Sequence, residues 1–302
     1  RFRDAPEVFA FLVEMAAVNS GASGRNHGLL HSGARYVSND TEAAIECRVE
    51  GDILKKTAAC AIEDTGGYFV AVEGDDEKYV ADFPSYCERA GIDCRPVAVE
   101  AARTAEPHLS PKTIAVYAVP DASFDPFRLS LEQVDQAVLH GGKILRRAQV
   151  VGFERRGDRI ASVRVRKADG SHLRIEAEQV VNAAGAWARD VAGLAGIDLN
   201  LLYSKGTLLI THGRLNRRVI NRLRPPSNAD ILVPGGTVSV LGTTSTQVDS
   251  LEDIRPTVAE ADAIVEEATP MVPCLATTRY IRALAGVRPL AGASSGGDGR
   301  SV

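Results

Sequence analysis

The sequence lacks the features that mark membrane-spanning, secreted or nucleic-acid-binding proteins. No apolar run among its 302 residues is long enough to cross a bilayer, and no signal peptide is evident at its start. The net charge of -4 and the absence of a long basic run give no reason to expect nucleic-acid binding. We therefore expect a cytoplasmic chain that reaches a membrane only peripherally or through a partner.

Cysteine is scarce, and the common catalytic motifs are missing. The five cysteines are odd in number and contain no C-x-x-C pair, so we interpret them as reduced thiols. No H-E-x-x-H, G-x-S-x-G or Walker motif occurs. No partner stands at metal-ligand spacing from His108, His140, His172 or His212, and we expect no metal site.

The most unusual stretch runs from Ser20 to Tyr36. It holds four glycines, three serines, two histidines and two arginines, in a chain whose 45% hydrophobic content is that of a soluble globular protein. Glycine costs backbone entropy in regular structure, so this composition is not that of a core helix or strand. The stretch is typical of a loop that brings backbone N–H groups close to a flat, polar ligand. A plain surface loop is the alternative.

Periodicity and capping signals predict an alternation of helices and strands. Asp4 and Glu7 form a predicted capping box for a first, short helix, as do Thr257 and Glu260 for the last. Helices are expected over residues 8–15, 41–59, 78–90, 126–141, 186–194 and 257–268. Strands are expected over residues 68–72, 94–100, 113–119, 180–184, 207–211, 231–234, 237–241 and 278–287, with a β-meander at 143–154, 159–167 and 171–175.

Seven motifs in order carry a family resemblance that covers roughly residues 20–292. They are S-G-R-N-H-G-L-L-H-S-G-A-R-Y, D-P-F-R-L, V-V-N-A-A-G-A-W, K-G-T-L-L-I, A-D-I-L-V-P-G, L-G-T-T-S and A-G-V-R-P-L. The set resembles the glycine and D-amino-acid oxidase-like family of FAD enzymes, in particular the large subunits of anaerobic glycerol-3-phosphate dehydrogenases. The resemblance implies an α/β (mixed α+β) fold, in which a Rossmann-type flavin domain is interleaved with a mixed-sheet substrate domain.

The resemblance also implies domain boundaries. The FAD-binding domain is expected at residues 20–60, 126–203 and 286–302, and the substrate domain at 61–125 and 204–285. The family begins with a strand, a G-x-G-x-x-G turn, a helix and a second strand that ends in an acidic residue. That unit is not evident here, so we expect a fragment that lacks it and the C-terminal part, with an incomplete FAD domain.

Oxidising a secondary alcohol with a flavin requires a proton acceptor and a grip on the substrate's anionic tail. In A-G-V-R-P-L the resemblance assigns Arg288 to substrate anchoring, and a surface ion pair is the alternative. Arg282 has the same strand parity as Arg288, so it is the neighbouring arginine expected on that face. His31 is expected to accept the hydroxyl proton or polarise the substrate, or else only to hydrogen-bond the flavin or backbone.

The remaining predicted site residues follow from the resemblance. Tyr36 and Thr243 are expected at the substrate, although packing and a strand-end turn explain them nearly as well. A close-packed strand-to-helix turn likewise explains N-A-A-G-A-W. The cofactor-binding residues are expected to be Ser23, Gly24, Arg25, Asn26, His27, Gly28, Leu29, His31, Val150, Ala183, Ala184, Gly185 and Trp187.

The implied reaction is the oxidation of sn-glycerol 3-phosphate to dihydroxyacetone phosphate. FAD accepts the hydride, and partner subunits pass the electrons to membrane quinone, which places the protein peripherally on the inner face of the membrane. One alternative is a related flavin enzyme acting on a 2-hydroxy or amino acid, such as L-2-hydroxyglutarate or sarcosine. Another is an inactive fragment unable to hold FAD.

Overall fold

The computed structural model describes residues 10–252 and 254–291, and most of its strands belong to one sheet. The nine strands are β4 (Gly67–Val72), β5 (Arg95–Pro96), β6 (Thr113–Val119), β12 (Leu201–Thr211), β13 (Val219–Arg222), β14 (Ile231–Gly235), β15 (Val238–Gly242), β16 (Thr246–Val248) and β17 (Tyr280–Ala291). Their order is β16-β12-β15-β14-β13-β4-β6-β5, with β17 also paired to β12. These strands come from residues 67–119 and 201–291, on either side of the meander in the sequence. The predicted domain boundaries stay predictions.

Strand β4 is buried on both faces, which explains its continuous apolar sequence. Successive side chains of a strand point to opposite faces. Tyr68, Val70 and Val72 therefore join one core cluster, together with Ile264 of α6 (Val258–Ala268). Phe69 and Ala71 join another with α2 (Glu77–Arg89) and with residues 34, 37 and 44. The sheet thus supports the Ser20–Tyr36 stretch on the face opposite α6.

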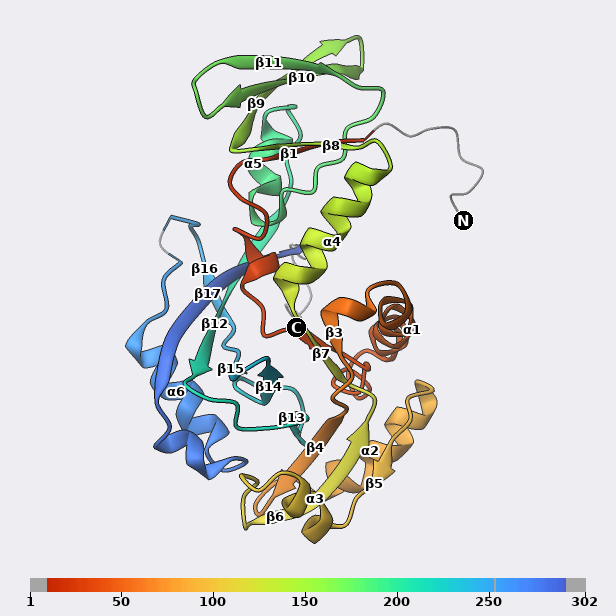
Figure 1. Ribbon diagram of the computed structural model, residues 1–302, viewed down its shortest axis with the longest axis vertical. Helices are drawn as coiled ribbons and strands as arrows, with labels where there is room; N and C mark the ends of the chain where they lie inside the picture. Colours follow the sequence, from red (N-terminus) through yellow and green to blue (C-terminus); the bar gives the residue numbers. More distant parts are fainter. Residues whose placement is uncertain (1–9, 253, 292–302) are drawn as a thin grey trace.

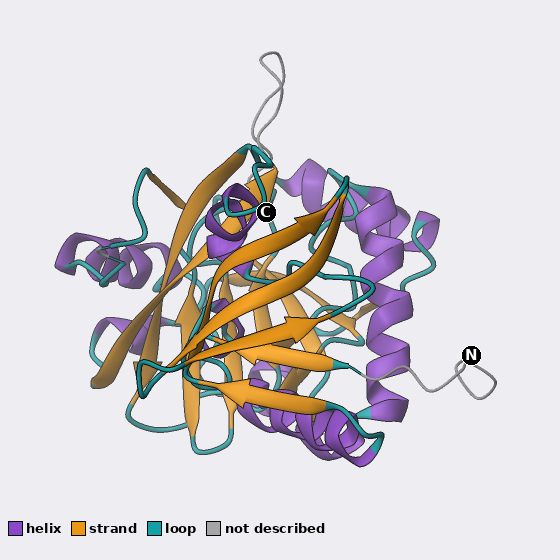
Figure 2. Cartoon of the chain, turned by 90° about the horizontal axis from the view of Figure 1, so that it is seen from above, coloured by secondary structure: helices purple, strands orange, loops and turns teal. Residues whose placement is uncertain are grey.

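Three smaller sheets complete the described structure. A meander of β9 (Ala148–Arg156), β10 (Arg159–Lys167) and β11 (His172–Glu176) lies at one end of the molecule (Figure 1). Beside it, β1 (Phe11–Glu14) pairs in parallel with β8 (Lys143–Arg146). β7 (Ala122–Phe124) lies between β2 (Leu29–Leu30) and β3 (Ile62–Glu63). Seen from that end, strands fill the middle of the molecule and helices flank them (Figure 2).

Three predicted helix starts are confirmed by their caps. Asp40 accepts a hydrogen bond from the backbone of Ala43 at the start of α1 (Thr41–Thr57), and Asp125 caps α4 (Pro126–Leu139) in the same way. Thr257 and Glu260 form both hydrogen bonds of a capping box on α6. The other helices are α3 (Val99–Ala105) and α5 (Ala188–Gly193). No helix in the described ranges combines the length and apolarity that crossing a bilayer requires.

Two predicted elements were wrong, one in its type and the other in its length. Residues 11–14 form strand β1 instead of part of a helix, because β8, some 130 residues later in the sequence, supplies its partner. The Asp4–Glu7 capping box lies outside the described residues. Of the strand expected at 94–100, only Arg95–Pro96 pairs, and Val99 already begins α3. Proline lacks the N–H that continues a ladder, which limits this strand.

The buried strand expected at residues 180–184 is also absent from the structure. Val181 is 84% exposed, and no described strand pairs with the segment. Asn182 instead binds its own turn: its amide donates to the carbonyl of Ala188 at 2.8 Å, and its oxygen accepts from the N–H of Ala184. Such local side-chain bonds compete with strand pairing. The helix predicted from 186 begins as the 3-10 turn Gly185–Trp187 and continues as α5.

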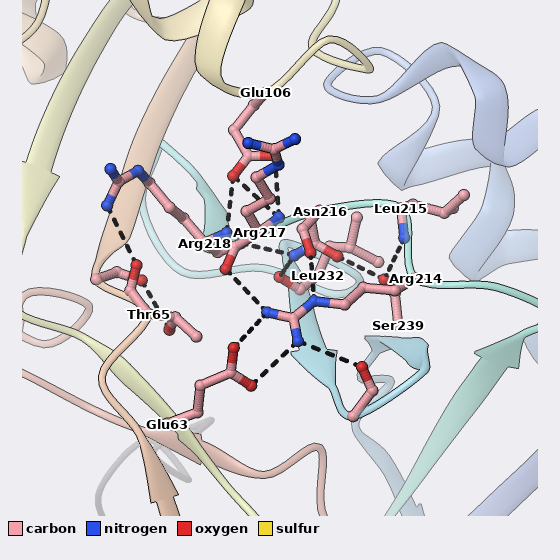
Figure 3. Close-up of polar contacts among 12 residues, drawn as sticks. Glu63, Thr65, Glu106, Arg214, Leu215, Asn216, Arg217, Arg218, Leu232 and Ser239 are labelled. Carbon is pink, nitrogen blue, oxygen red and sulfur yellow. Dashed lines mark hydrogen bonds and ion pairs between the residues drawn. The ribbon is translucent and has the colours of Figure 1, made fainter.

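A buried carboxylate fixes the approach to β13 (Figure 3). Glu106, which is 2% exposed, accepts hydrogen bonds from the backbone N–H groups of Arg217 at 3.0 Å and Arg218 at 2.7 Å. Next to it, the guanidinium of Arg214 binds the carboxylate of Glu63 on β3 at 2.7 Å. These contacts join the end of α3, the small β2-β7-β3 sheet and the central sheet.

Gly33 and Gly74 provide a matched test of the packing beneath the Ser20–Tyr36 stretch. Both have a positive φ, 95° and 93°, but a Cβ on Gly33 would lie 2.1 Å from the carbonyl oxygen of Ala44, whereas one on Gly74 would meet nothing within 4 Å. We expect Gly74→Ala to cost about 1–2 kcal/mol of backbone strain. Gly33→Ala should cost at least about 1–3 kcal/mol more through overpacking. Urea unfolding of both variants measures the difference, and equal losses would contradict this packing.

Candidate active site

The Ser20–Tyr36 stretch lies against the paired strands β12 and β17. Gly206 and Gly286 stand directly opposite each other in the register. A Cβ on Gly286 would be 3.0 Å from Cβ of Arg25, so the absence of a side chain at Gly286 lets the loop pack closely on the strand. The guanidinium of Arg25 donates to the carbonyl of Ala285 at 3.2 Å. The loop is thereby fixed two residues from Arg288 along the same face of β17.

Two histidines and a tyrosine of the loop lie in a row. The ring centres of His27 and His31 are 5.9 Å apart, and those of His31 and Tyr36 are 5.5 Å apart. Nδ1 of His27 accepts the backbone N–H of Leu29 at 3.2 Å, so in the neutral ring the proton is on Nε2. The row therefore places His31, the predicted proton acceptor, next to Tyr36, the predicted substrate contact.

Arg35 and Arg288 supply the positive charge around this row. Burial, assisted by both arginines, lowers the pKa of His27 to about 4. Burial lowers the pKa of His31 well below its usual value, and the charges of His27 and Arg35 add to the effect. Burial also raises the pKa of Tyr36, although the two arginines oppose that change. At neutral pH both imidazoles are therefore neutral and able to accept a proton, and the phenol keeps its proton.

Arg288 is held by the strand end that bears Thr243. Its guanidinium donates to Oγ of Ser204 at 3.1 Å and to the carbonyl of Thr244 at 3.2 Å. Oγ1 of Thr243 lies beside Gly206, where a Cβ would be 2.6 Å from it. The structure therefore brings Arg288, Thr243, His31 and Tyr36 to one place. Burial lowers the pKa of Arg288, yet an arginine keeps its charge at neutral pH.

The predicted flavin-loop residues occupy one continuous segment. Asn26 bonds within the loop, donating to the carbonyl of Ser23 and accepting from the N–H of Gly28. The ring of Trp187 is 3.7 Å from the Cβ position of Gly21, so the 183–187 turn adjoins the loop. Ala183 and Gly185 in that turn are exposed, as is Ser23, whereas Gly24 and Leu29 are buried.

Two predicted site residues lie elsewhere. Arg282 is exposed and stands six residues from Arg288 on β17, about 20 Å away at the rise of an extended strand. Val150 pairs with Val165 in the meander, and its side chain packs into that sheet's own apolar cluster. The structure does not bring either side chain to the row of histidines, and their roles stay predictions.

Two further candidates, Glu14 and Arg35, were not among the predicted site residues. Glu14 ends β1, a strand parallel to β8, and the apolar run F-L-V-E before the glycine-rich loop was the available signal. Arg35 donates to the carbonyl of Ser227 at 2.9 Å and lies 3.6 Å from Asp230, and its positive charge also acts on His31. Glu14, at the end of a parallel strand, is the kind of carboxylate that binds a nucleotide ribose in Rossmann-type folds.

Comparison with known proteins decides the family. Residues 10–300 match the FAD dependent oxidoreductase (DAO) family. The chain belongs to this family. It is 43% identical over 294 residues to one subunit of the anaerobic glycerol-3-phosphate dehydrogenase of Escherichia coli strain K12, covering 96% of this chain and 54% of that protein. The equivalent protein of Haemophilus influenzae is 39% identical, covering 96% and 52%. The chain thus spans about half the length of the curated relatives it matches.

Solved structures confirm the predicted fold. The L-alpha-glycerophosphate oxidase of Mycoplasma pneumoniae, solved with FAD bound, superposes with a TM-score of 0.77 at 18% identity, covering 94% of this chain and 77% of that one. The glycine oxidase of Geobacillus kaustophilus has a TM-score of 0.71 at 18% identity, covering 93% and 76%. At these identities the likeness shows the mixed α/β fold of the family and no more.

The residues present fit one side of an FAD. Glu14 is placed for the ribose at the end of a parallel strand, and the exposed residues Ser23, Ala183 and Gly185 leave an open, small-residue surface beside the loop. A Cβ on Gly185 would meet nothing within 4 Å, so that surface is not filled by the chain itself. A flavin bound there would supply the hydride acceptor for oxidation of the substrate.

The neutral state of His27 can be measured directly. NMR titration of the imidazole carbons should give His27 a pKa of about 4. Arg35→Gln should raise it, because removing a neighbouring positive charge makes protonation less costly. Lys112→Gln, an exposed change just before β6, is the control and should leave the titration unchanged. A wild-type His27 that titrates near the usual value of about 6.5 would contradict this electrostatic environment.

Proposed function

We propose that this chain carries the substrate-facing part of an FAD-dependent dehydrogenase that oxidises sn-glycerol 3-phosphate to dihydroxyacetone phosphate. The observation that carries the proposal is the pair Arg35 and Arg288, two arginines that both lie close enough to His27 and Tyr36 to affect their pKa values. A phosphate dianion calls for guanidinium groups, because their forked N–H donors match its oxygens. Similarity to two proteins named for glycerol-3-phosphate dehydrogenase supports the same substrate.

In this proposal the arginines bind the phosphate and the loop orients the alcohol. Ser204 and the Thr244 carbonyl fix the direction of Arg288, which limits how the phosphate can sit. Tyr36 keeps its proton and donates a hydrogen bond to a substrate oxygen. These contacts hold the substrate carbon at a constant position relative to His31.

His31 then takes the hydroxyl proton as the C–H bond breaks. A neutral imidazole is required for this step, and burial provides it. The phosphate dianion offsets the positive charge of Arg35, so substrate binding should raise the basicity of His31 when the proton must be accepted. His27, one ring away, supports the position of His31 in the row.

The route of the electrons is part of the proposal. The similar proteins are named as single subunits of a dehydrogenase, which supports further subunits that carry electrons to membrane quinone and hold the protein peripherally at the inner face of the membrane. A 2-hydroxy acid or amino acid substrate would need one carboxylate anchor. The second arginine at this site favours the phosphate instead.

A flavin spectrum tests whether this chain acts by itself. The purified chain should take up FAD and show a bound flavin band, which should bleach when sn-glycerol 3-phosphate is added without oxygen. L-2-hydroxyglutarate and sarcosine serve as comparison substrates and should leave the band unchanged. A colourless protein that takes up no FAD, or a band bleached by the comparison substrates alone, would contradict the proposal.

Arg288→Ala tests the phosphate anchor. Losing charged hydrogen bonds to the phosphate should raise KM for glycerol 3-phosphate about 10- to 100-fold. Arg279→Ala is the matched control, because Arg279 is exposed just before the same strand. Steady-state reduction of an artificial electron acceptor measures both variants. An unchanged KM in Arg288→Ala, with the control also unchanged, would refute the assignment.

A further inference from the structure

The positive charge of this protein is concentrated in one part of the fold. Residues 143–176, which form β8 to β11, contain ten lysines and arginines but only four aspartates and glutamates, a net charge of +6. The chain as a whole has a net charge of -4, so the rest is strongly acidic. The meander lies at one end of the molecule, and β5 and α3 lie at the other (Figure 1). The two ends therefore differ in electrostatic potential.

The β9–β10 hairpin tip carries the least compensated charge. Arg155, Arg156 and Arg159 are all exposed around the turn. Arg156 and Arg159 are direct cross-strand partners, and like charges in that position are destabilising. Within the ranges that the structure describes, these three side chains make no ion pair or hydrogen bond, and Asp158 is the one acid in the turn. The positive charge of these three side chains is therefore not neutralised by the described part of the fold.

The outer face of the meander continues this patch. Arg164 and Arg166 share one face of β10, and Arg174 of β11 stands opposite Arg164. The guanidinium of Arg164 lies over Gly152, where a Cβ would be 2.5 Å from it. Arg174 is neutralised by Glu154 at 2.7 Å and by Glu176, whereas Arg166 bonds only the neutral amide of Gln149 at 2.6 Å.

The chemistry of this surface favours a lipid partner over a macromolecular one. Phe153 is the one aromatic residue in 143–176, and it packs into the meander's own core. Protein interfaces depend on aromatic and apolar anchors at their centre, and single-stranded nucleic acid is held by aromatic stacking. Anionic lipid headgroups need only clustered cations, each contributing roughly 1 kcal/mol near the surface.

We propose that the hairpin tip formed by Arg155, Arg156 and Arg159, with the adjoining outer face, binds an anionic membrane surface directly. This contact requires no membrane-spanning helix and no partner subunit. None of the three tip arginines is among the predicted flavin-site residues. The contact is electrostatic, so it should weaken as salt shortens the screening length from about 10 Å at 0.1 M to about 3 Å at 1 M.

Co-sedimentation with lipid vesicles tests this proposal. The purified chain should pellet with vesicles of phosphatidylcholine mixed with phosphatidylglycerol, and not with phosphatidylcholine alone. Replacing all three tip arginines with alanine (Arg155→Ala, Arg156→Ala and Arg159→Ala) should weaken vesicle binding on the order of 100-fold. The control replaces three exposed cations of the opposite end, Lys78→Ala, Arg95→Ala and Lys112→Ala, and should bind as the wild type does.

Each other outcome would overturn the proposal. Failure of the wild-type chain to bind phosphatidylglycerol vesicles would do so, as would equal loss in both triple variants. Binding to polyglutamate or to a DNA duplex without binding to vesicles would assign the patch to an acidic protein or a nucleic acid. Matching circular dichroism and melting curves would confirm that the variants fold, so a loss of binding can be attributed to charge.

Discussion

The buried carboxylate of Asp121 joins the parts on which the site depends. One of its oxygens accepts the backbone N–H of Ser32 at 2.8 Å, next to His31, and the other accepts the side-chain amide of Asn221 on β13 at 3.0 Å. It also packs onto Gly67 of β4, where a Cβ would be 2.7 Å away. Burial raises the pKa of Asp121, while these hydrogen bonds lower it. One side chain thus ties the histidine loop to the central sheet.

This attachment makes the electrostatics of the site specific to one geometry. The histidines are neutral mainly because burial lowers their pKa values, and Arg35 adds to this effect at both rings while Arg288 adds to it at His27. Both conditions require the loop to stay against β17, where Gly286 provides the space. A loop that moved into solvent would hydrate the imidazoles, and their pKa values would return toward their usual range. Packing at Gly67 and Gly286 therefore controls the proton affinity of the two histidines.

The sequence predicted what was encoded locally. Asp40, Asp125 and Thr257 were correct helix starts because a cap depends on residues three positions apart. The strand at 11–14 was missed because its partner is distant in the chain, and the strand at 180–184 was wrong because Asn182 forms a local turn. Strand parity placed Arg282 on the face of Arg288 but ignored the length of strand between them. No pattern in the sequence pointed to Asp121, which acts through the fold alone.

The separation of charge bears on how an anionic substrate would be recognised. Outside the meander the chain is net negative, so its overall field does not attract a phosphate to the site. In the proposed function, recognition would then come from Arg35 and Arg288. The side chain of Arg35 is only 14% exposed, and Arg288 is partly buried, so salt screens their charge less than it screens surface charge. The basic surface of the meander and the arginines of the site can therefore act on different anions, one by clustered exposed charge and the other by a few buried donors.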